Sequence, residues 1–140
     1  VSEFIRGNRR TVLGPEQMVT GVRIPKPRGT ARSDFLKLGA RRFLVISIVS
    51  AAGLVVCDGD GVVAQAGIAI GACSEVPARL SELEAAIVGR PLTPELAQTA
   101  TPEHLAALSP IDDCRATRAY RLDAALTLTR RLLAALGTGS

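Results

Sequence analysis

Aromatic side chains and histidine are scarce in this sequence. Phe, Trp and Tyr make up 3% of the 140 residues, Trp is absent, and the one histidine is His104. The core must therefore be built from Val, Ile, Leu and Ala, and few rings are left on which single-stranded nucleic-acid bases could stack. A histidine without a nearby nucleophile and carboxylate forms no catalytic triad, so we expect His104 to have a surface or capping role.

The sequence also lacks the common patterns for disulfides, metal sites and phosphate loops. The number of cysteines is odd, and no two of them form a CxxC motif; they are Cys57, Cys73 and Cys114. We therefore expect buried free thiols in the reducing cytoplasm. Asp112 and Asp113 are too few ligands for a metal and suit a loop or a helix start better. No GxGxxG or Walker pattern occurs, and no apolar run reaches the roughly 18 residues of a membrane span.

Positive charge is concentrated in the first third of the chain. Residues 1–45 carry ten Lys and Arg against three acidic residues, a net charge of +7, whereas residues 46–140 carry −3. A basic half is typical of a solvated rim, of a phosphate-bearing cofactor site, or of a surface for an acidic partner. Nucleic-acid binding is the least favoured alternative, because stacking rings are so few.

One stretch combines these basic residues with a long apolar run. Lys37 lies two residues after Phe35, so both point to the same face of a strand. A half-buried lysine on that face needs an anion or a carbonyl partner. Arg41 and Arg42 follow, either as an anion site or as a plain surface pair. The run 43–49 comes next, apolar except for Ser47, and we expect it to be buried. Residues 41–47 could form either a short helix or a continued strand, because periodicity does not decide such runs.

Alternating patterns predict strands in the first half of the chain. The clearest signal is Asp-Gly twice in succession at residues 58–61, which indicates a hairpin turn between apolar, β-branched runs. Its second arm places Ile68 and Ile70 on one face and small residues on the other. The expected strands are residues 18–24, 33–38, 50–57 and 62–72.

Helical patterns follow the hairpin. Ser81-x-x-Glu84 has the form of a capping box, and Thr93 and Thr101 are each followed by Pro and Glu, as at helix starts. The longest helix is expected at 116–136, with four leucines as its apolar stripe and its arginines outside it. The stripe consists of Leu122, Leu126, Leu133 and Leu136.

Strands first and helices afterwards predict an α+β fold. We expect a two-layer sandwich in which about three helices cover one face of a mostly antiparallel sheet of three or four strands. Residues 1–14 are assigned to an arm, residues 15–137 to one domain, and residues 138–140 to a disordered tail.

Five stretches in order give the chain a family resemblance. It is similar to the C-terminal domain of the FAD-binding (medium) subunit of molybdenum hydroxylases, the family of carbon monoxide dehydrogenase and xanthine dehydrogenase. The similarity covers nearly the whole chain. The stretches are PEQMVTGVRIP (15–25), FLKLGARR (35–42), IAIGAC (68–73), ARL (78–80) with ELEAAIVGRPL (82–92), and DDCRATRAYR (112–121).

The resemblance implies a cofactor and residues that contact it. The medium subunit of such an oxidoreductase binds FAD and passes electrons from iron–sulfur clusters, fed by the molybdenum site, to an acceptor such as NAD or a quinone. Met18 and Val19 resemble the apolar pair that lines the FAD pocket, and Lys37 resembles a lysine beside the flavin ring. Arg41 and Arg42 resemble the basic pair of the adjoining loop.

The resemblance also implies partners. They are an N-terminal FAD-binding domain, which supplies most phosphate contacts, a molybdopterin subunit and an iron–sulfur subunit. Residues 1–14 resemble only the tail of that N-terminal domain. This chain alone is therefore expected to be catalytically incomplete and to bind FAD weakly or not at all. The alternative function is a flavin-free docking module that uses its basic face on an acidic partner, with homo-oligomerisation through an apolar sheet edge or helix.

Overall fold

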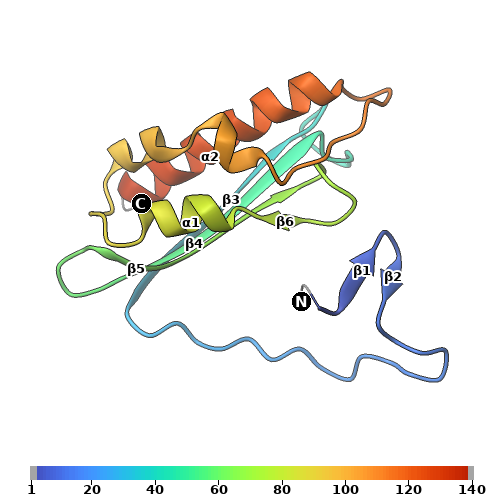
Figure 1. Cartoon of the computed structure of the whole chain (residues 1–140), viewed down its shortest axis with the longest axis horizontal. Coiled ribbons are helices and arrows are strands. Elements are labelled where there is room, and N and C mark those ends of the chain that lie inside the picture. The colour runs from blue at the N-terminus through green and yellow to red at the C-terminus, as the bar shows by residue number, and fades with distance from the viewer. Residues whose placement is uncertain (1–2, 139–140) are drawn as a thin grey trace.

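The computed structural model describes residues 3–138, and it has the expected α+β architecture. Four strands form one antiparallel sheet in the order β3-β4-β5-β6, while β1 and β2 pair separately. All helices lie on one side of the larger sheet (Figure 1). The elements are β1 (Ile5–Gly7), β2 (Arg10–Thr11), β3 (Thr30–Leu38), β4 (Val49–Cys57), β5 (Val63–Gly71), β6 (Ala78–Arg79), α1 (Ser81–Ile87), the 3₁₀ helices η1 (Pro94–Thr99) and η2 (Pro102–Leu105), and α2 (Arg118–Thr138).

The predicted hairpin between β4 and β5 is confirmed. The side chain of Asp58 accepts hydrogen bonds from the backbone N–H groups of Asp60 (3.0 Å) and Val62 (2.9 Å), which closes the turn. Gly61 has a φ of +75°, a conformation that glycine adopts without steric cost. The turn residues therefore fix the register of the two central strands.

The two faces of the sheet differ in side-chain size, as the sequence of residues 62–72 predicted. Ile68 and Ile70 are fully buried against the helices, and the small residues beside them in sequence point to the opposite face. Burying such aliphatic side chains contributes roughly 1.5–3 kcal/mol each. The core of the sandwich consists chiefly of Val49, Ala51, Val55, Ile68, Ile70, Leu83, Ile87, Leu128, Leu132, Leu133 and Leu136.

The buried face of α2 differs from the predicted leucine stripe. Leu133 and Leu136 are buried, but Leu122 and Leu126 are only partly so. Arg121, expected outside the stripe, is 2% exposed. The helix continues to Thr138, two residues beyond the expected end, so the first residue of the tail expected at 138–140 is helical. Residues 139–140 lie outside the described part of the chain. Counting leucines alone misplaced the stripe, because alanines and an arginine fill part of the buried face.

Helix starts were predicted in part. α1 has Leu80 at its N-cap and no side-chain cap, so the capping box is wrong. Glu84 instead accepts a hydrogen bond from the Ile68 N–H (2.8 Å) and ties the helix to β5. Thr101 is the N-cap of η2, as predicted. The backbone N–H of Thr101 donates a hydrogen bond to His104 Nδ1 (3.2 Å). The capping role expected for His104 is confirmed.

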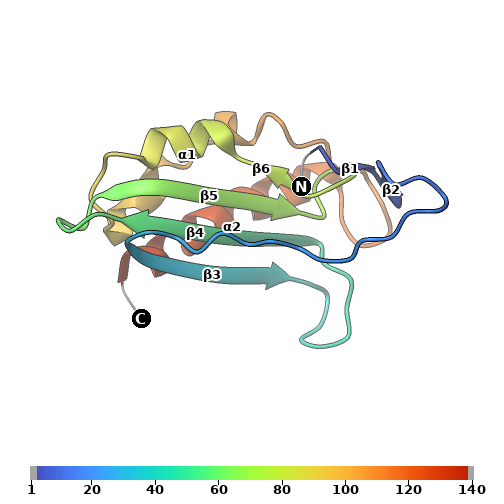
Figure 2. The same cartoon turned by 90° about the horizontal axis from the view of Figure 1, so that it is seen from below.

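The strand predicted at residues 18–24 is wrong. Residues 12–29 form an extended connector that pairs with no strand among the described residues. The connector runs along the side of the sheet that faces away from the helices (Figures 1 and 2). Alternation in sequence shows which residues share a face, but a strand also needs a neighbour for its N–H and C=O groups. Val22 and Ile24 are accordingly 77% and 82% exposed.

Two of the three cysteines are buried, as the sequence predicted. Cys57 and Cys73 are buried free thiols, whereas Cys114 is exposed, contrary to expectation. Burial raises the pKa of the Cys73 thiol. Within residues 3–138, none of the helices has the length and apolar character needed to cross a bilayer.

We predict that Gly137→Ala destabilises the fold, although Ala is the better helix former. A Cβ at residue 137 would lie 2.3 Å from the backbone carbon of Thr93, where α2 approaches the start of η1. We expect a loss of roughly 1–3 kcal/mol in the free energy of unfolding, as for other overpacked sites. Urea titration followed by circular dichroism measures it. The matched control is Gly21→Ala, whose added Cβ meets nothing within 4 Å; an equal effect in both variants would contradict the prediction.

Candidate functional site

The loop between β3 and β4, residues 39–48, carries most of the predicted basic site. It is neither helix nor strand, and the Ile48 N–H donates to the Leu38 carbonyl (2.8 Å) where the loop returns to the sheet. The predicted burial of residues 43–49 is confirmed at Ile48 and Val49. It is wrong for most of residues 43–46, because the loop extends past the end of the sheet, where no helix covers it (Figure 2). The large apolar side chains left exposed are Phe43 (70%), Leu44 (93%) and Ile46 (64%).

Lys37 lies near the end of β3 on the face away from the helices. Its neighbour Phe35 shares that face and is 59% exposed. The Lys37 ammonium donates a hydrogen bond to the Val45 carbonyl (2.7 Å) of the loop. The predicted carbonyl partner is therefore present, although the lysine is exposed and not half-buried.

The two arginines have different contacts within the same loop. Arg41 donates through Nε (3.2 Å) and Nη2 (2.5 Å) to the carbonyl of Leu44, a non-glycine residue whose φ is +48°. Arg42 lies over the ring of Phe43, with its guanidinium carbon 5.1 Å from the ring centre. Gly39 permits this tight fold, because a Cβ there would meet Val45 at 2.5 Å.

These basic residues meet at one cavity, and the apolar pair does not join them. The cavity has a volume of about 450 Å³ and is lined by Lys37, Leu38, Gly39, Arg41, Arg42 and Val45. Met18 and Val19 lie on the connector, 77% and 49% exposed, and do not line that cavity. Three of the five predicted site residues are thus brought together by β3 and its loop.

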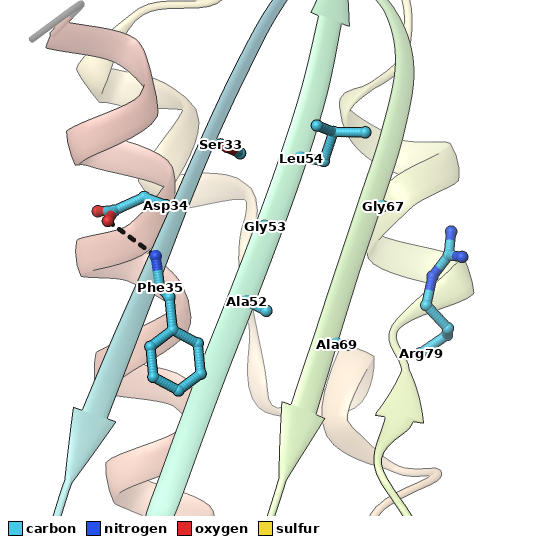
Figure 3. A pocket seen from close by; sticks show the side chains of 9 residues that line it. All are labelled: Ser33, Asp34, Phe35, Ala52, Gly53, Leu54, Gly67, Ala69 and Arg79. Carbon is cyan, nitrogen blue, oxygen red and sulfur yellow. Dashed lines mark hydrogen bonds between the residues drawn. The ribbon is translucent and has the colours of Figure 1, made fainter. Parts of the chain in front are cut away.

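A second, shallower hollow of about 680 Å³ lies on the bare face of the sheet (Figure 3). Its floor is made of small residues, because Ala52, Gly67 and Ala69 point outward from neighbouring strands. Phe35 and Leu54 add larger apolar groups, and Arg79 from β6 stands at its edge. Such a floor suits a flat apolar group or another backbone.

Sequence reasoning missed Arg121 as a member of the site. Its Nη1 donates to the carbonyls of Ile48 (2.6 Å) and Ala72 (3.0 Å), and its Nη2 donates to Asp113 (2.7 Å). The signal was present in the spacing: residues 121, 125, 128, 132 and 136 lie on one face of a helix, and all five are buried. The predicted stripe was built from leucines alone and therefore left Arg121 outside it, and arginine is rarely fully buried.

Asp113 is the acidic partner in this cluster. It accepts a hydrogen bond from the backbone N–H of Arg115 (2.9 Å) and pairs with the Arg115 and Arg121 side chains. The Arg115 N–H first, and then Arg121, lower the pKa of Asp113 to about 2. Among residues 3–138, no group of three or more His, Cys, Asp and Glu could hold a metal. Asp113 lies in a loop, as predicted, and its ion pairs with Arg115 and Arg121 are seen only in the structure.

Comparison with known proteins gives one family. Residues 34–136 match the model of the CO dehydrogenase flavoprotein C-terminal domain. The nicotinate dehydrogenase FAD-subunit of Eubacterium barkeri is 32% identical over 105 residues, which cover 73% of this chain and 36% of that protein. The chain thus spans little more than a third of the curated relative that it matches.

Solved structures agree on the fold. CO dehydrogenase from Oligotropha carboxidovorans superposes with a TM-score of 0.85 at 23% identity, over 99% of this chain and 48% of that one. Quinoline 2-oxidoreductase from Pseudomonas putida 86 gives 0.84 at 26% identity, over 99% of this chain and 47% of that one. Both comparisons include the connector and the β1–β2 pair as well as the sandwich.

We predict that Asp113 stabilises the fold in a pH-dependent way. Its folded pKa of about 2 lies below the ordinary 3.8, so its contribution is complete above about pH 4 and is lost as pH falls through about 2. Asp113→Asn removes this contribution. The gap in unfolding free energy between the wild type and the variant should therefore narrow from pH 5 to pH 2 in urea titrations. A constant gap across that range would contradict the prediction.

Proposed function

Because the chain belongs to the CO dehydrogenase flavoprotein C-terminal domain family, we propose that it is the C-terminal domain of an FAD-containing subunit of a molybdenum hydroxylase. Its part in that oxidoreductase is to hold one side of the flavin that relays electrons from iron–sulfur clusters to an acceptor. The observation that carries the proposal is the Lys37 ammonium, held by one carbonyl on the bare side of the sheet at a cavity that two arginines share.

The chemistry of Lys37 fits a flavin ring. An ammonium has three N–H donors, and the Val45 carbonyl takes one of them, which leaves two for electron-rich atoms of a ligand. FAD supplies the redox chemistry when it is bound. The positive charge of Lys37 favours the reduced, anionic form of a neighbouring flavin over the oxidised form. Arg41 supports this arrangement by shaping the loop, and Arg42 adds positive charge at the cavity rim.

Met18 and Val19 belong, in this proposal, to the apolar lining of the flavin pocket in the assembled subunit. Their connector runs on the bare side of the sheet, the same side on which Lys37 lies (Figures 1 and 2). Clustered exposed apolar side chains indicate a surface that a partner or ligand covers. The flavin ring and the FAD-binding domain that holds its phosphates would cover this one.

The partners follow from the same proposal. An N-terminal FAD-binding domain completes the flavin site, and molybdopterin and iron–sulfur subunits deliver the electrons. The relatives are about twice as long as this chain, which supports a function shared with further domains. Two buried free thiols support a reducing compartment, the cytoplasm.

We predict that Lys37→Ala weakens FAD binding about tenfold. Hydrogen bonds to charged groups contribute roughly 1.5–3 kcal/mol, and 1.4 kcal/mol corresponds to a factor of ten. The purified chain is titrated with FAD up to millimolar concentration and followed by flavin fluorescence and absorbance. Weak but saturable binding is expected, because this half of the site lacks phosphate contacts.

Lys26→Ala is the matched control, since the chain contains only the two lysines Lys26 and Lys37. Lys26 lies on the connector, is exposed, and should leave the affinity unchanged. If both substitutions weaken FAD binding equally, the loss of affinity comes from the lower net charge, and a specific role for Lys37 is contradicted. Absence of saturable binding would overturn the claim that this chain's own residues hold the flavin.

A further inference from the structure

Arg121 is the one charged side chain that is fully buried among residues 3–138. It enters the sandwich from the first turn of α2 and reaches the end of the sheet where β4 begins and β5 ends. There it holds the carbonyl of Ile48, just before β4, and that of Ala72, just after β5. One guanidinium therefore fixes the backbone at the ends of two neighbouring strands.

Stability alone does not account for this residue. Removing an arginine and a carboxylate from water costs several kcal/mol, and replacing a buried ion pair by apolar side chains is often neutral or stabilising. The Nε of Arg121 is buried and has no hydrogen-bond partner among the described residues, which adds to the cost. A group retained at such a cost calls for a positional explanation.

The contacts of Arg121 lead directly to the basic loop. Ile48 is the last residue of the loop, and while its carbonyl is held by Arg121, its N–H donates to Leu38 (2.8 Å). Leu38 is the residue after Lys37. Val45 lies three residues before Ile48, and its carbonyl accepts a hydrogen bond from the Lys37 ammonium (2.7 Å). The position of Ile48 thus sets how far the Val45 carbonyl lies from Lys37.

Asp113 keeps the guanidinium in this orientation. Its Oδ1 accepts from Arg121 Nη2 (2.7 Å) and also from the backbone N–H groups of Arg115 (2.9 Å) and Ala116 (3.2 Å). The carboxylate is therefore anchored by its own loop before it meets Arg121. The cluster joins four segments: the 110–117 loop, α2, the return of the β3–β4 loop and the residue that follows β5.

We propose that Arg121 is a positioning residue for residues 39–48: it fixes the return of the loop at Ile48 and thereby holds the Lys37 ammonium in place on the bare side of the sheet. The effect on the loop stands on the contacts alone. The effect on flavin binding rests on the function proposed for Lys37. The two effects are measured separately.

The test removes both charges, so that no unpaired carboxylate is left. The double variant Arg121→Met, Asp113→Asn is compared with Arg131→Met, because Arg131 is an exposed residue of the same helix and its loss leaves the Arg121–Asp113 pair intact. Hydrogen–deuterium exchange on the full chain should show a loss of protection of about tenfold or more at the Ile48 amide, whose N–H donates to Leu38, in the first variant alone. Amides of β5 and of the middle of α2 should be unchanged.

Two further measurements separate positioning from a general structural role. Arg121→Lys keeps a cation that can reach the two carbonyls, so it should restore part of the protection of Ile48. In FAD titrations, the Arg121→Met double variant should lose about as much affinity as Lys37→Ala, and adding Lys37→Ala to it should cost little more, because both changes disturb one arrangement.

Each outcome decides the proposal. Protection lost evenly over the sheet and α2, or retained in the loop, would overturn it. If the Arg121→Met double variant does not fold, the exchange pattern of Arg121→Lys decides by the same criterion. If Lys37→Ala leaves FAD affinity unchanged while the loop loses protection, the function proposed for Lys37 fails and the positioning role of Arg121 stands.

Discussion

Helices cover only one face of the four-stranded sheet, and the placement of every other part follows from this. On the covered face, β4 and β5 carry the large aliphatic side chains that pack against α1 and α2. On the other face, the same strands carry mainly small residues, and Ala52, Gly67 and Ala69 line an open hollow. Apolar burial, the largest favourable term in folding, is therefore concentrated in the layer between the sheet and the helices. The opposite face is left for contacts with other groups: the burial pattern of β3 places Lys37 on that side, and the connector runs along it (Figure 1).

Local patterns predicted the elements whose causes are local. The Asp58–Gly61 turn, the strands beside it and the threonine starts of η1 and η2 each follow from residues within a few positions of one another. The connector and the loop 39–48 could not be predicted in this way. Residues 18–24 alternate as a strand does but have no pairing partner among the described residues. Residues 43–46 are apolar but extend past the end of the sheet. Burial depends on which elements lie opposite in space, and neither sequence pattern carries that information.

The candidate site shows the same division. Lys37, Arg41 and Arg42 are close in sequence, so one loop brings them to a common cavity. Arg121 reaches the same loop from 73 residues away, and only the fold makes it a neighbour of Ile48. Its burial broke the expectation that an arginine lies on the polar side of a helix. Places where sequence rules fail are often those where a structure needs a particular geometry, and here that place is where the basic loop returns to the sheet.

The late position of α2 in the chain has a consequence for synthesis on the ribosome. The guanidinium of Arg32 in β3 donates to the carbonyl of Leu136 across 104 residues (3.0 Å), so the first strand of the sheet and the last turn of the helix meet only when both are made. Until then, the aliphatic face of β4 and β5 has no α2 to cover it. Exposed strands of this kind are prone to aggregation. Nascent chains that stall before residue 118 would therefore be substrates for chaperones that bind extended apolar segments.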